Sequence, residues 1–207
     1  MNNDNLSERL KQIKRSFRLF MNGETSRSMR EKGVEYKLNW GVPVTRLRTM
    51  AAEYGKDHDL AMALWQENVR ECKLLGTLIM PADAMTRADV EAWIPGITSL
   101  ELAEQCAMNL FRSLPFASDL AYDWLSSDNE MLVICAYHLL SRLFLQGHTP
   151  SDTQCAALFD HAPKALQSEV YGLQKAAYNC LLRFADQGEK QEQMVREKLE
   201  MLNLDIF

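Results

Sequence analysis

The sequence has no apolar run long enough to cross a bilayer and no apolar segment of the secretory type at its start. A spanning helix needs about 18 consecutive apolar residues, whereas the chain begins with the polar run Met-Asn-Asn-Asp-Asn. Its cysteines are single and far apart, with no Cys-x-x-Cys pair and no neighbouring His at metal-ligand spacing. We therefore expect a cytoplasmic protein whose thiols are small buried hydrophobes.

The sequence also lacks the short motifs of several enzyme classes. It contains no Gly-rich phosphate loop, no His-Glu-x-x-His and no nucleophile elbow. The four histidines, His58, His138, His148 and His161, stand apart, and we interpret each as a surface or core residue rather than a base. We expect no metal and no cofactor.

One helical unit recurs about every thirty residues. Each unit begins with a short helix that ends in a bulky aromatic, followed by a longer helix with a cysteine in the middle of one face. The short helices are expected at residues 60–65, 90–94, 120–125 and 155–159, and the long ones at 68–79, 99–114, 128–145 and 166–185. One helical hairpin cannot bury its apolar face alone, so the period predicts a stacked array with a long binding surface.

The flanking segments also follow helical spacing. Residues 7–21 form an amphipathic pattern with a strongly basic polar face and Ser7 as a candidate N-cap. Residues 26–40 predict a short helix and a structured loop, and residues 45–54 predict the next helix. Residues 189–202 predict a charged capping helix. Period-two alternation of strand length is missing, so we expect an all-α fold.

Charge is divided unevenly along the chain. Residues 1–56 hold twelve Lys/Arg and six Asp/Glu, whereas residues 57–207 hold eleven and twenty-two. The basic residues alternate with Tyr36 and Trp40, which is typical of surfaces that bind a phosphate backbone. The alternative is an ordinary solvated helix face. The residues predicted to contact phosphates are Arg30, Lys32, Lys37, Arg46, Arg48, Arg70 and Lys175.

Glu101 and Glu104 form the one carboxylate pair with possible chemical use. Residues three apart share a helix face. On a concave face, like charges and partial burial would raise one pKa and suit that acid to charge stabilisation. The alternative is a solvated acidic face.

Several short segments resemble the AlkD-like DNA alkylation repair family. They are Met29-Arg-Glu-Lys-Gly, Trp40-Gly-Val-Pro-Val-Thr-Arg-Leu-Arg48, Ser127-Asp-Asn129 and Gln174-Lys-Ala176, and the resemblance covers about residues 10–200. It implies a right-handed α-solenoid of about six HEAT-like helix pairs that grips duplex DNA with a basic concave face. We expect one domain over residues 1–207, with basic N-terminal helices to 56, repeats at 57–186 and a cap at 187–207. Active members of the family excise cationic alkylated purines with a carboxylate and without a metal.

The chain departs from the catalytic pattern that the resemblance implies. Leu100 stands at the place of a Trp, Glu104 at the place of an Asp, Ile134 at that of an Arg and Asn179 at that of a second Trp. We therefore expect a monomeric duplex-DNA-binding relative with weak or absent base excision and no membrane contact. Two alternatives stay open: an alkylpurine glycosylase that uses Glu104, and a protein-binding solenoid whose acidic half recruits a partner.

Overall fold

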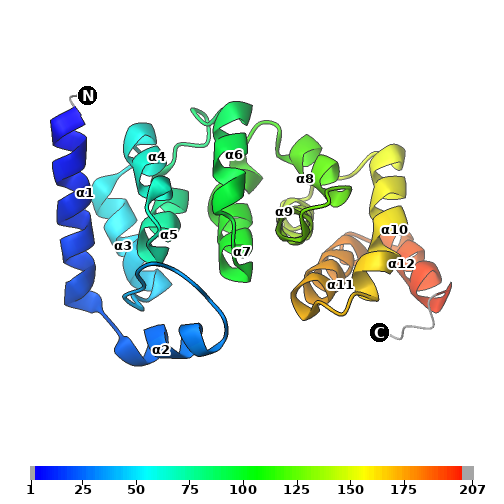
Figure 1. Ribbon diagram of the computed structural model, residues 1–207. Helices are drawn as coiled ribbons and strands as arrows, with labels where there is room; N and C mark the ends of the chain where they lie inside the picture. The colour runs from blue at the N-terminus through cyan, green and yellow to red at the C-terminus, as the bar shows by residue number, and fades with distance from the viewer. Residues whose placement is uncertain (1–2, 202–207) are drawn as a thin grey trace. The chain divides into compact units, whose positions relative to one another are not determined.

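The computed structural model describes residues 3–201, and within that range it is built from twelve α-helices without a β-strand (Figure 1). The helices are α1 (Asn3–Phe17), α2 (Gly23–Glu31), α3 (Val44–Tyr54), α4 (His58–Gln66), α5 (Arg70–Ile79), α6 (Arg87–Trp93), α7 (Leu100–Asn109), α8 (Ala117–Leu125), α9 (Glu130–Leu145), α10 (Asp152–Leu166), α11 (Tyr171–Ala185) and α12 (Glu189–Met201). The all-α prediction is confirmed. Over the described range, no helix combines the length and the apolar character that spanning a membrane requires.

The chain divides into two compact units, the first up to residue 105 and the second from residue 106, with the boundary inside α7. The four repeats expected from the sequence correspond to α4–α5, α6–α7, α8–α9 and α10–α11. The prediction of a single continuous domain stays a prediction.

In the first unit, α5 packs against α3 and α4, and α1 packs against α4. Ile13 and Phe17 are the buried apolar residues of α1, and the Arg9 guanidinium donates to the Asp57 carboxylate at 2.7 Å. Two repeat aromatics, Trp65 and Trp93, stack with ring centroids 4.1 Å apart. Trp65 and Trp93 are therefore core residues, as the spacing indicated, and in the second unit Trp124 is buried whereas Phe159 is half-buried.

Helix ends in the first unit follow their capping residues. The Asp57 side chain accepts from the Leu60 N–H at the start of α4, and the Asn22 side chain accepts from the Thr25 N–H at the start of α2. Ser7 was wrong as an N-cap, because α1 begins at Asn3 and Ser7 lies inside it. The first helix also ends earlier than expected, at Phe17, and continues as a 3₁₀ turn over Arg18–Phe20.

In the second unit, α9 packs against both α8 and α11, and α11 also contacts α10 and α12. Cys135 and Cys180 are buried on these long helices, as expected. The expected helix at 166–185 is in fact two elements, because α10 ends at Leu166 and the extended backbone of Val170 precedes α11. Val195 and Leu199 bury the apolar face of α12, whereas the expected fourth position of that face, 202, lies outside the described residues.

Candidate nucleic-acid interface

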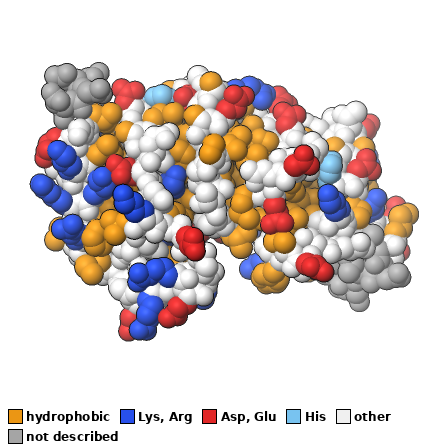
Figure 2. All heavy atoms as spheres, viewed as in Figure 1, with side chains coloured by type: hydrophobic (Ala, Val, Ile, Leu, Met, Phe, Trp, Pro, Cys, Tyr) orange, Lys and Arg blue, Asp and Glu red, His pale blue; other side chains and the backbone are white. Residues whose placement is uncertain are grey.

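The basic surface of the first unit lies over α1 and α2, where lysine and arginine side chains gather on the face shown in Figure 2. Three cations of α1, Lys11, Lys14 and Arg15, belong to it together with Arg18 of the 3₁₀ turn that follows. Lys11, Arg15 and Arg18 are exposed, whereas Lys14 is half-buried at the edge of the buried apolar face of α1.

Five cations of this surface line one hollow of about 430 Å³. We call it the basic hollow, and its lining consists of Lys11, Lys14, Arg15, Arg18, Lys37, Leu38, Trp40, Glu67, Asn68 and Val69. Glu67 is the one acid of this lining, and it accepts from the Lys14 ammonium at 2.9 Å. The guanidinium of Arg18 lies 5.3 Å from the centre of the Trp40 ring. The hollow therefore combines an excess of positive charge with an aromatic side chain, which is the chemistry of a phosphate-backbone contact.

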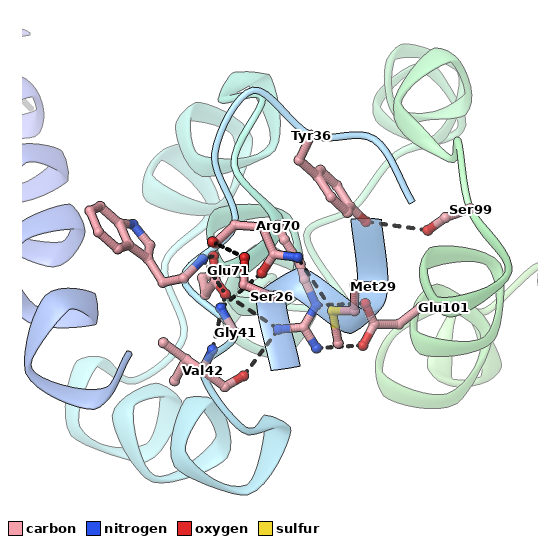
Figure 3. A network of polar contacts seen from close by, with 11 residues as sticks. Ser26, Met29, Tyr36, Gly41, Val42, Arg70, Glu71, Ser99 and Glu101 are labelled. Carbon is pink, nitrogen blue, oxygen red and sulfur yellow. Dashed lines mark hydrogen bonds and ion pairs between the residues drawn. The ribbon is translucent and has the colours of Figure 1, made fainter. Parts of the chain in front are cut away.

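The segment of residues 38–42, which carries part of this lining, is held by the first residues of α5 (Figure 3). The buried Glu71 carboxylate accepts from the Trp40 N–H and the Val42 N–H, each at 3.2 Å. Leu38 pairs with Val69 as an isolated parallel bridge, through bonds from the Leu38 N–H to the Asn68 carbonyl and from the Arg70 N–H to the Leu38 carbonyl. These bonds fix a segment that has no regular secondary structure of its own.

Arg70 was wrong as a phosphate contact. It is only 2% exposed, and its guanidinium donates to both oxygens of Glu101, at 2.5 and 2.8 Å, to the Val42 carbonyl at 3.0 Å and to Glu71 at 3.3 Å. Burial lowers the pKa of Arg70, but the hydrogen bonds and charges of Glu101 and Glu71 outweigh it, so the pKa of the guanidinium is raised. The guanidinium is buried and bound by protein acceptors, so it is not accessible to a ligand.

The other predicted contacts differ in their surroundings. Arg46 is half-buried, with its guanidinium 3.9 Å from the centre of the Phe20 ring, so part of its role is structural. Arg30, Lys32, Lys37 and Arg48 are exposed in the first unit. Of these, Lys37 lines the basic hollow. Lys175 belongs to the second unit, where its ammonium lies 5.9 Å from the centre of the Tyr171 ring.

The contacts predicted from the sequence do not include Lys11, Lys14, Arg15 and Arg18. The sequence does carry a signal for them, since the polar face of residues 7–21 is strongly basic. What the sequence did not show is that residues 37–40 and 67–69 lie close enough to α1 to enclose a hollow with it.

The positions aligned with the family's catalytic residues carry few side chains that could take part in base excision. Leu100 is 46% exposed and Glu104 is half-buried, both on α7. In the second unit, Ile134 is fully buried, so this position presents no side chain to a ligand, and Asn179 is exposed. Glu101, the other carboxylate of the expected pair, is bound by Arg70 and is therefore not a free acid.

The Nε2 atoms of His58 and His148 each have a hydrogen-bond partner about thirty positions away in the chain. His58 Nε2 lies 3.3 Å from the Asp89 carboxylate, and His148 Nε2 lies 3.1 Å from the Ser118 hydroxyl. Within residues 3–201, no group of three or more His, Cys, Asp or Glu side chains is arranged to hold a metal ion.

Comparison with known proteins identifies the family of this chain. Residues 13–200 match the family described as DNA alkylation repair enzyme. One solved structure, described as "a new family of proteins related to the HEAT-like repeat DNA glycosylases with affinity for branched DNA structures", is similar with a TM-score of 0.80 and 16% identity, covering 93% of this chain and 82% of that one. None of the curated proteins matches.

The structural likeness confirms the fold class as an all-α, HEAT-like α-solenoid. The family match extends over nearly the whole chain, from within α1 to the last turn of α12. The chain therefore belongs to the AlkD-like family of DNA alkylation repair enzymes.

Proposed function

We propose that this protein binds DNA through the basic hollow of its first unit and excises alkylated bases weakly or not at all. The observation that carries the proposal is the composition of the hollow, whose lining includes five cations, one acid and a tryptophan. Phosphates along a strand are regularly spaced anions, and each one that a Lys or Arg neutralises releases counterions and favours binding. Nothing in this interaction requires base-specific contacts.

The family and the structural neighbour support DNA as the ligand. The family is one of DNA repair enzymes, and the neighbour is described as having affinity for branched DNA structures. We propose the same ligand class for this chain, with branched DNA and plain duplex as the two forms to compare.

The loss of excision follows from the side chains at the catalytic positions. An alkylated purine already carries positive charge, so the group to be stabilised in the transition state is the cation that develops on the sugar. That requires a carboxylate at short range and fixed walls around the sugar, whereas Leu100 and Asn179 are not aromatic and Glu104 has one more rotatable bond than Asp. We infer that a bound lesion would be held without efficient cleavage.

Binding titrations with labelled duplex and four-way-junction DNA at several salt concentrations test the proposal. The variant Lys11→Ala/Arg15→Ala/Arg18→Ala removes three exposed cations of the basic hollow. The matched control, Lys164→Ala/Arg183→Ala/Lys190→Ala, removes three exposed cations of the second unit.

We expect the wild-type protein to bind with a steep salt dependence. Each phosphate contact contributes about 0.9 to the slope of log K against log salt concentration on duplex DNA. The variant of the basic hollow should lose about two to three units of that slope, while the control should stay within half a unit of the wild type. Equal losses in the two variants, or wild-type binding indifferent to salt, would refute the proposal.

A further inference from the structure

We propose that Arg70 and Glu71 are positioning residues for the basic hollow: they fix residues 38–42 so that Lys37 and Trp40 line it before DNA arrives. This inference rests on the proposed function, because it concerns the same hollow. Neither residue touches the ligand in this account. Both act through the backbone of the segment that carries the lining.

The segment needs such an anchor because its backbone has no regular pairing. A buried N–H without a partner costs about as much as a lost hydrogen bond, so each donor in a buried loop must be satisfied. Glu71, at 0% exposure, satisfies the N–H groups of Trp40 and Val42 with one carboxylate (Figure 3). The charge on the acceptor strengthens both bonds.

Arg70 pairs with that buried carboxylate and also binds the backbone of the segment directly. Its guanidinium contacts Glu71 and also donates to the carbonyl of Val42, whose N–H is already held by Glu71. Two further hydrogen bonds, from the Arg70 guanidinium to the two oxygens of Glu101, hold the guanidinium in one orientation (Figure 3). A lone buried charge is costly, whereas one Arg between two carboxylates is compensated and directional.

The backbone at Gly41 packs tightly against the residues that precede and begin α2. Gly41 has φ +69, and an added Cβ would lie 2.2 Å from the carbonyl oxygen of Asn22. The Asn39 side chain accepts from the Gly41 N–H at 2.8 Å, and the Ser26 hydroxyl donates to the Asn39 carbonyl at 2.8 Å. The segment is therefore held against α2 as well as α5.

The functional consequence is pre-organisation. A loop that must be ordered on binding loses affinity, because its conformational entropy is lost at that moment. A loop held by a buried carboxylate has already lost that freedom in folding. Releasing the anchor should therefore weaken DNA binding even though every cation of the hollow is still present.

Three variants separate this role from a contribution to folding alone. Glu71→Gln keeps the shape of the side chain but removes its charge and replaces one acceptor with a donor. Lys37→Ala removes the cation next to the segment and leaves the anchor intact. Glu101→Gln weakens the hold on Arg70 at a partly exposed position and replaces Glu71→Gln if that protein does not fold.

Two measurements are made on each variant. The first, without DNA, is hydrogen exchange of the Trp40 and Val42 amides, which we expect to quicken at least tenfold in Glu71→Gln and to stay unchanged in Lys37→Ala. The second is the salt slope of DNA binding. Glu71→Gln should lose about 0.9 of the slope, as Lys37→Ala does, and the double variant should lose little more than either alone.

Unchanged exchange at these amides in Glu71→Gln and Glu101→Gln would overturn the inference. Faster exchange with an unchanged salt slope and affinity would also overturn it, because the anchor would then be structural only. If the wild type itself fails to bind DNA, the proposed function fails first, which is a different outcome from wild-type binding that the variants leave unaltered.

Discussion

Glu67 sits among the cations of the basic hollow and is predicted to restrain DNA binding. Its carboxylate accepts a hydrogen bond from the Lys14 ammonium at 2.9 Å, and its side chain is 30% exposed. A phosphate entering the hollow must compete with this carboxylate for Lys14 and also meets its like charge. The substitution Glu67→Gln removes the charge while keeping the size and a hydrogen-bonding oxygen.

The size of the effect follows from Coulomb's law. Two unit charges about 6 Å apart in water interact by about 0.7 kcal/mol, and salt at 0.1 M reduces this across a Debye length of about 10 Å. We expect Glu67→Gln to tighten DNA binding by about 0.5–1 kcal/mol, or about two- to fivefold. Because Lys14 is released to a phosphate, the salt slope should also steepen by up to about 0.9.

The assay is a titration of labelled DNA at several salt concentrations with the wild type, Glu67→Gln and Glu53→Gln. Glu53 is an exposed acid on α3 outside the lining of the hollow, so its substitution changes net charge equally. We expect Glu53→Gln to change affinity much less than Glu67→Gln. Weaker binding by Glu67→Gln, or equal gains in both variants, would refute the reasoning.

Three further predictions concern stability and chemistry. Arg46→Ala should lower stability by about 0.5–2 kcal/mol through loss of its contact with Phe20, whereas exposed Arg48→Ala should stay within about 0.5 kcal/mol; equal melting temperatures for the two variants would contradict this. Single-turnover release of 7-methylguanine and 3-methyladenine should not exceed the spontaneous rate, and a clear wild-type rate abolished by Glu104→Gln would instead establish a glycosylase. The Asp57 carboxyl is penalised by burial, but the Leu60 N–H and Arg9 outweigh this and lower its pKa below 3.8; its stabilisation is therefore complete above the unfolded pKa and disappears as pH falls through the folded value. Thermal unfolding of Asp57→Asn should accordingly depend less on pH between about 5 and 2 than that of the wild type, and parallel curves would count against the assignment.

The repeat core could be predicted from the sequence because burial there depends on local periodicity. Trp65 and Trp93 recur at equivalent positions, and the structure stacks them in the core. Cys135 and Cys180 occupy the middle of long apolar faces, and they are buried as well. Helix ends were less accurate, since the break between α10 and α11 depends on a few extended residues such as Val170.

The interface could be predicted only as a basic region, because the fate of each cation depends on distant partners. Arg70 is buried by an acid 31 positions later in the chain, and Arg46 is covered by Phe20. An arginine in a sequence is most often an exposed one, so neither outcome could be inferred from local composition. Conversely, Lys14 and Arg18 line a hollow only because the fold places residues 37–40 close to them, and this contact is not visible in the sequence.

An amide and indole NMR titration of the protein with four-way-junction DNA tests directly whether DNA binds in the basic hollow. We expect chemical-shift changes to concentrate in residues 11–18, 37–40 and 67–69, with the indole N–H of Trp40 among them. Changes confined to the second unit, around Lys175 and Tyr171, or no changes at low salt, would contradict it.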